Sequence, residues 1–106
     1  MSASGDLESY FLYTEITVVA GGYTGTGHAW GLGVGAVAFV GVLGYDSWED
    51  LTSAENGITI VGAGLAANLV LIIFSINGHD VATLTTGGLG ASVILGVHGT
   101  LKWTRT

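Results

Sequence analysis

Three long stretches of the chain contain no Asp, Glu, Lys or Arg: residues 16–44, 57–78 and 81–101. A helix that crosses a bilayer needs about 20 consecutive, mainly apolar residues, and each stretch is long enough. Together they take up most of the 106 residues, which leaves little chain for a water-filled active site. The sequence therefore predicts a small membrane-type or lipid-associated protein.

Composition supports this class and excludes several others. Only 9% of the residues are charged, whereas ordinary soluble domains have about 25%. With one Lys, one Arg and a net charge of −6, direct binding of nucleic acid is not expected, because phosphate contacts need basic side chains. The absence of cysteine excludes disulfides and thiolate metal sites. The first ten residues lack the basic start of a secretory signal, so no leader is expected.

The predicted fold is all-α, a single multi-helix hydrophobic domain over residues 1–106 with apolar segments at about 10–44, 57–77 and 81–101. The last two segments would form a helical hairpin around the polar turn at 77–80. An N-terminal Gly-rich helix would precede them. Residues 21–27 contain four glycines, which favours a break there and a short fourth helix at the N-terminus; the alternative is one long, closely packed helix.

A β architecture is the competing interpretation, because Val, Ile and Thr are frequent. Strands that are buried on one face alternate strictly between polar and apolar residues, and that alternation is absent here. The charge-free runs are also much longer than a typical strand. We therefore expect helices.

Small residues four positions apart recur in each predicted helix. Helices in lipid associate through close van der Waals contact, and small side chains permit it. In a chain with 19 glycines, chance would also produce some of these pairs. The predicted helix-packing residues are Gly27, Gly31 and Gly35, then Gly62 and Ala66, then Gly88, Ser92 and Gly96.

Four further residues have predicted structural roles in a membrane. Asn68 lies in the most apolar segment, where a buried amide would hydrogen-bond between helices or, alternatively, line a solute path. Trp30, Trp48 and Trp103 are predicted interface anchors, because Trp concentrates at membrane–water boundaries; ordinary packing is the alternative for each.

Chemistry-bearing motifs are scarce. Glu15, His28 and His98 are the candidates for proton or ion transfer, and each also fits a hydrated interface. The glycines at 31, 33 and 35 are not followed by the Lys and Ser/Thr of a phosphate-binding loop. The three histidines are too far apart in sequence for a local metal motif. We predict no enzyme, no cofactor and no metal.

Residues 57–101, with their tight polar turn at 77–80, resemble the hydrophobic helical-hairpin coat proteins of spindle-shaped archaeal viruses and conjugation-type pilins. The resemblance covers less than half of the chain, and no functional residue is carried over from it. It implies a helical structural subunit.

The predicted function is therefore a structural subunit that self-assembles through its Gly-rich helix faces into a lipid-associated homo-oligomer. A virion coat or membrane protein and a pilus-like filament are examples, and the location would be a membrane or a virion or extracellular assembly. The expected partners are copies of the chain and lipid. The alternative is a holin-like, channel or transport subunit, whose basic C-terminal end at Lys102 and Arg105 would lie in the cytoplasm.

Overall fold

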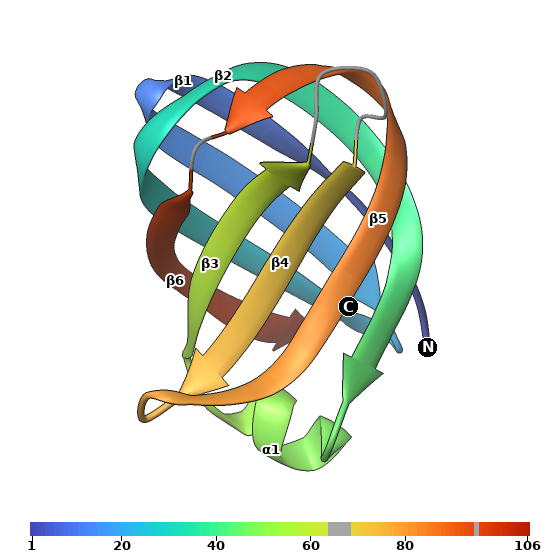
Figure 1. Ribbon diagram of the computed structural model, residues 1–106. Coiled ribbons are helices and arrows are strands. Elements are labelled where there is room, and N and C mark those ends of the chain that lie inside the picture. The colour runs from blue at the N-terminus through green and yellow to red at the C-terminus, as the bar shows by residue number, and fades with distance from the viewer. Residues whose placement is uncertain (64–68, 95) are drawn as a thin grey trace.

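The computed structural model describes residues 1–63, 69–94 and 96–106, and the fold is nearly all-β (Figure 1). Every pairing between its strands is antiparallel. The elements are β1 (Ser2–Ala20), β2 (Tyr23–Tyr45), α1 (Trp48–Ser53), β3 (Asn56–Ala63), β4 (Leu69–Ile76), β5 (His79–Ile94) and β6 (Val97–Arg105).

The sheet closes into a ring because β2 has different neighbours along its length. Its first part, Tyr23 to Trp30, pairs with β6, and its second part, Gly33 to Tyr45, pairs with β5. Strands β4 and β3 complete the circle in the order β2-β5-β4-β3-β6-β2. Strand β1 lies along the other edge of β2 from end to end.

The all-α prediction, with its helical hairpin over 57–101, is wrong. These residues form β3, β4, β5 and β6. The turn at Asn77 and Gly78 exists, but it joins two strands: Ile76 pairs with His79, and the turn residues have φ of 52° and 80°. Two residues with positive φ suit a tight β-hairpin. Gly21 and Gly22, with φ of 54° and 80°, join β1 to β2 in the same way.

The misassignment has a physical cause in β2. Buried and exposed residues alternate along this strand, as they must when one face lies against the core. Both faces are apolar, however: Val37 and Phe39 point into the core, while Val40 and Val42 are exposed. A strand with apolar residues on both faces has no polar–apolar alternation and reads like an apolar helix.

This fold overturns the structural-subunit, holin and channel interpretations, because all of them depended on packed apolar helices. Helix α1 has only six residues. No helix within the described ranges has the length and apolar character needed to cross a membrane.

The predicted helix-packing residues have other roles or lie elsewhere. Gly31 and Gly35 have φ of 146° and 124°, which residues with a side chain rarely adopt, and they let β2 bend. A Cβ on Gly27 would lie 2.6 Å from the Thr100 backbone oxygen, so this glycine permits close approach of β6. The others are distributed as follows: Gly62 is on β3, Gly88 and Ser92 are on β5, Gly96 precedes β6, and Ala66 and Asn68 lie outside the described residues.

The core fills the ring, and α1 lies at one end of it (Figure 1). Leu51 of α1 is 1% exposed and belongs to the core cluster. The Ser47 hydroxyl accepts a hydrogen bond from the Asp50 backbone N–H, which caps the helix start. The largest fully buried side chains are Phe74, Leu7, Ile16, Leu43, Leu51, Ile60, Ile72, Leu84, Leu101, Val18, Val37 and Val70.

Candidate functional site

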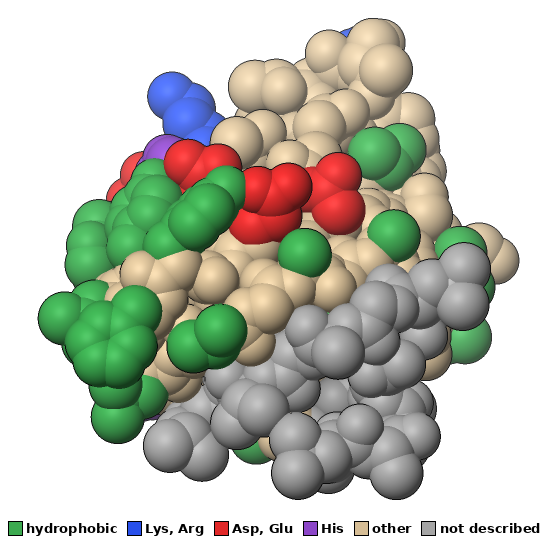
Figure 2. Space-filling model, turned by 90° about the horizontal axis from the view of Figure 1, so that it is seen from above, with side chains coloured by type: hydrophobic (Ala, Val, Ile, Leu, Met, Phe, Trp, Pro, Cys, Tyr) green, Lys and Arg blue, Asp and Glu red, His purple; other side chains and the backbone are tan. Residues whose placement is uncertain are grey.

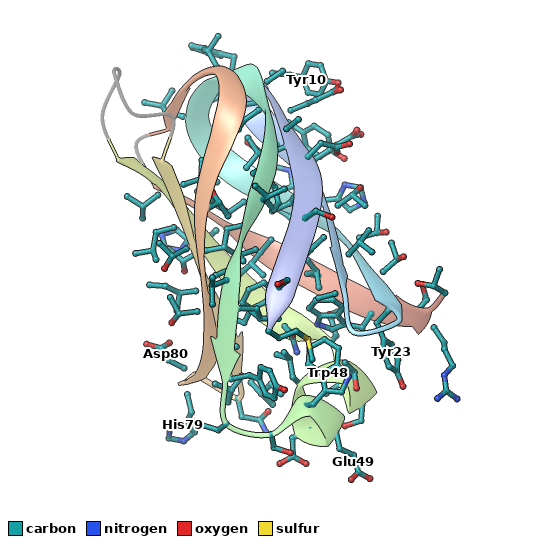
Figure 3. All side chains as sticks on the ribbon, turned by 90° about the vertical axis from the view of Figure 1, so that its right-hand side faces the viewer. Tyr10, Tyr23, Trp48, Glu49, His79 and Asp80 are labelled. Carbon is teal, nitrogen blue, oxygen red and sulfur yellow. The ribbon has the colours of Figure 1, made fainter. Side chains whose placement is uncertain are left out.

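Large apolar side chains are exposed where the two strands of the β1–β2 hairpin bend, around Phe11 on β1 and Leu32 on β2. This bend lies at the end of the molecule opposite α1. Figure 3 places Tyr10 at this end and Trp48 and Glu49 at the other. The cross-strand pairs Tyr10 with Val34 and Tyr13 with Trp30 bring the two strands together here. We call six exposed residues the apolar tip: Tyr10, Phe11 and Leu12 on β1, at 57%, 61% and 55% exposure, and Trp30, Leu32 and Val34 on β2, at 57%, 46% and 58%.

A β-bulge causes this exposure. Phe11 pairs with Gly33 and Tyr13 pairs with Trp30, so the register shifts across Leu12. Phe11 has φ of 77°, a left-handed conformation that is a genuine outlier for a bulky residue. Such a conformation costs about 1–3 kcal/mol. The bulge places three consecutive side chains outside, where a regular strand would bury every second one.

Residues 8–15 read Glu-Ser-Tyr-Phe-Leu-Tyr-Thr-Glu, a near-palindrome centred on the bend. The bend brings together the residues at equivalent positions in the two halves of this near-palindrome. The hydroxyls of Ser9 and Thr14 are hydrogen-bonded at 2.8 Å and buried. The rings of Tyr10 and Tyr13 stack with centroids 6.4 Å apart. We call residues 8–15 the folded palindrome.

The two glutamates of the folded palindrome act on the same tyrosine pair. The hydroxyl of Tyr10 donates to the Glu8 carboxylate, and the hydroxyl of Tyr13 donates to Glu15 Oε1 at 3.4 Å. The hydrogen bond to Glu8, together with desolvation and the charges of Glu8 and Glu15, raises the pKa of Tyr10 to about 12. Desolvation and then Glu15 raise the pKa of Tyr13. The charge of Glu15 therefore reaches Tyr10 across the bend.

Two side chains of β2 extend the aromatic surface. His28 pairs with Glu15, stacks on Tyr13 with centroids 5.6 Å apart, and its Nδ1 contacts the Tyr13 hydroxyl. Trp30 meets the Tyr13 ring edge-on at 6.1 Å. Figure 2 shows hydrophobic side chains next to acidic ones on the face seen from above. Aromatic faces beside carboxylates are a surface that attracts organic cations.

The predicted tryptophan anchors lie in two different environments. Trp30 is exposed at the apolar tip, whereas Trp103 is 5% exposed and belongs to the core. The indole of Trp103 donates to Asn56 Oδ1 at 2.7 Å and meets the Trp48 ring at 5.6 Å. Trp103 is therefore a core residue, and Trp48, the half-buried first residue of α1, packs against it.

The candidates for proton or ion transfer are partly brought together. Glu15 and His28 are cross-strand neighbours, and His98 pairs with Trp30 one strand further on, where its Nδ1 lies 3.1 Å from the Thr59 hydroxyl. Among the residues that the structure describes, no three His, Asp or Glu form a group suited to a metal ion. The aromatic residues Tyr10 and Tyr13 suit a membrane interface by sequence, but sequence reasoning missed Glu8 and the stacking of the two rings, although the symmetry of residues 8–15 was a visible signal.

A second exposed apolar area lies on the outer face of the same hairpin and differs in chemistry. An open hollow of about 430 Å³ is lined by Ser2, Ala3, Ser4, Val19, Val40, Gly41 and Val42, which include no aromatic and no charged side chain. Val40 is 68% exposed, so it is as accessible as the residues of the apolar tip.

Comparisons with known proteins identify relatives of this fold. A family model described as Rhodococcus equi virulence-associated protein matches residues 1–104. The structure is similar to that of VapB from the intracellular pathogen Rhodococcus equi, with a TM-score of 0.85 and 22% identity over 99% of this chain and 95% of that one. It is also similar to that of VapD from Rhodococcus equi, with a TM-score of 0.83 and 24% identity over 97% and 95%. No curated protein sequence matches the chain.

At these identities the two solved structures establish the fold alone. The family match also overturns the resemblance to viral coat proteins and pilins.

Proposed function

Because the chain belongs to the Rhodococcus equi virulence-associated protein family, we propose that it is a non-catalytic virulence protein that binds the surface of a lipid bilayer through its apolar tip. Attachment would be peripheral. The lipid partner inferred from the charge-free stretches is thus retained, with exposed side chains of strands in place of spanning helices.

The exposure of the apolar tip is the observation that carries this proposal. Its six large apolar side chains are between 46% and 61% exposed and come from two adjacent strands. Burying one such side chain fully contributes about 1.5–3 kcal/mol, so several acting together suffice for reversible membrane attachment. Tyr10 and Trp30 suit the headgroup region, because each has an apolar ring and a polar group.

The location of the ionisable groups supports a binding role over catalysis. Glu8, Glu15 and His28 are exposed. Catalytic electrostatics work best where water is excluded, and these side chains remain in contact with solvent.

The test is co-flotation with lipid vesicles. The variant is the double substitution Phe11→Ser with Leu12→Ser, and the matched control is Val40→Ser, which removes an equally exposed apolar side chain from the hollow. We expect the wild type and the control to float with the vesicles and the tip variant to lose at least about tenfold in affinity, because each tenfold corresponds to about 1.4 kcal/mol. Absence of wild-type flotation, or equal losses in both variants, would contradict the proposal.

A further inference from the structure

Building on the proposed bilayer attachment, we propose that the folded palindrome recognises the choline headgroup of zwitterionic lipids. The quaternary ammonium would lie against the rings of Tyr10 and Tyr13, with the carboxylates of Glu8 and Glu15 beside it.

The first argument is the convergence of four side chains that are distributed over eight residues of sequence. The bend stacks Tyr10 on Tyr13, with an interplanar angle of 22°. Each phenol is held by a glutamate two residues away in sequence, Glu8 on one arm and Glu15 on the other. The result is one surface with two aromatic rings and two carboxylates, on the strained bend that also presents Phe11.

The second argument is charge complementarity. The Glu8 carboxylate accepts a hydrogen bond from Tyr10, the Glu15 carboxylate accepts one from Tyr13, and the two rings stack with centroids 6.4 Å apart, so the two negative charges lie on one surface. The only Lys and Arg of the chain, Lys102 and Arg105, lie on β6 opposite Thr26 and Tyr23 rather than at the bend. A surface of this sign repels anionic lipids and attracts the cationic end of a zwitterionic headgroup.

The third argument selects a quaternary ammonium over other cations. Its methyl groups spread the charge and pack against aromatic faces, which is how proteins recognise choline. A primary ammonium is a compact, strongly hydrated charge that loses more hydration on contact with a ring. The phenols of Tyr10 and Tyr13 remain neutral donors to the carboxylates at physiological pH, because the ordinary pKa of a tyrosine is about 10.

The experiment measures vesicle binding as a function of headgroup. Vesicles of phosphatidylcholine are compared with vesicles in which most of that lipid is replaced by phosphatidylethanolamine, which has the same net charge but lacks the three methyl groups, or by anionic phosphatidylglycerol. We expect binding to phosphatidylcholine to be at least about fivefold tighter than to either, corresponding to roughly 1 kcal/mol of cation–π attraction. Free phosphocholine should compete, and free phosphoethanolamine should compete less.

Two variants separate headgroup recognition from attachment. Glu8→Gln combined with Glu15→Gln should weaken binding to both zwitterionic lipids, whose headgroups carry a cation beside the carboxylates, and should not weaken binding to phosphatidylglycerol. The double substitution Phe11→Ser with Leu12→Ser should weaken binding to every vesicle. Circular dichroism confirms that each variant is folded, and both changes affect exposed side chains.

The outcomes distinguish the two proposals. Equal binding to phosphatidylcholine and phosphatidylethanolamine would overturn choline recognition and leave bilayer attachment standing. Tighter binding to phosphatidylglycerol would overturn the charge argument in the same way. Absence of binding to any vesicle would overturn both.

Discussion

Aromatic clusters lie at both ends of the molecule, and they differ in their access to water. Near α1, Trp103 is 5% exposed, and its indole N–H is satisfied by Asn56. At the apolar tip, Tyr10 and Trp30 are each 57% exposed. The same residue types therefore stabilise the fold at one end and remain available for a partner at the other.

Hydrogen bonding and backbone conformation show the same contrast between the two ends. The side-chain amide of Asn56 donates to the Leu51 and Ala54 carbonyls at 3.0 and 3.2 Å, so the polar groups beside the buried cluster are paired. At the tip, Phe11 adopts a positive φ. Strain that persists at an exposed site is typical of functional regions. Stability and binding should consequently respond to different substitutions.

Trp103→Ala should have the largest effect on stability, a loss of about 3–5 kcal/mol in the free energy of unfolding, because it removes a buried ring. It also leaves Asn56 Oδ1 without its donor. Urea denaturation measures the loss. The control Trp30→Ala removes an exposed ring at the tip and should cost less than about 1 kcal/mol. Similar losses in the two variants would abolish the distinction between the ends.

Gly31→Ala should come next, with a loss of about 1–3 kcal/mol, because it forces a side chain into an unfavourable backbone conformation. Gly31 has φ of 146°, and an added Cβ would lie 2.8 Å from Val97 Cγ1. Gly87→Ala is the control, since a Cβ there meets nothing within 4 Å. Thermal unfolding compares the two variants. A tolerated Gly31→Ala would mean that the bend does not need glycine.

Phe11→Gly should act in opposite directions on stability and binding. Glycine accepts positive φ, so the substitution relieves the backbone strain at residue 11. Because glycine also makes the unfolded chain more flexible, the net gain in the free energy of unfolding should be at most about 1 kcal/mol. Vesicle binding should fall because the exposed ring is lost. Phe11→Ala should lose the same binding without the gain in stability. A less stable Phe11→Gly variant would show that the Phe11 ring stabilises the fold.

Alkaline pH should have the smallest effect. The pKa of Tyr10 is raised from 10.0 to about 12 in the folded protein, first by its hydrogen bond to Glu8. Between these values the unfolded chain loses this proton and the folded chain keeps it, so the contribution of Tyr10 to stability is present below pH 10 and is lost as the pH rises towards 12. Ultraviolet titration of tyrosinate measures the pKa. With Glu8→Gln it should move back towards 10, and an unchanged value would exclude Glu8 as the cause.

Sequence reasoning located the turn at 77–80 and misjudged what it connects. Asn77–Gly78 was identified as a turn, and a tight Asn-Gly turn between apolar runs is also a strong signal for a β-hairpin. The missing polar–apolar alternation outweighed it. In β2 the exposed positions carry Val40 and Val42. A sequence pattern that expects polar residues at exposed positions therefore does not recognise this strand.

The candidate site was visible in sequence only in fragments. Glu15 and His28 were identified, and Trp30 was one of the three predicted anchors. Their convergence with Tyr10 depends on the bulge at Phe11, a non-glycine residue in a left-handed conformation. Residue preferences do not predict such an outlier, because the surrounding fold imposes it.

By itself the sequence determined that most of the chain is uncharged, that a polar turn occurs at 77–80, and that a near-palindrome surrounds Phe11. Only the tertiary structure decided which apolar residues are inside. Pairing of β2 with both β5 and β6 closes the sheet, and closure directs alternate side chains inward or outward whatever their polarity. The charge-free runs therefore supply both the core and an exposed apolar surface, because closure is set by contacts between strands far apart in sequence.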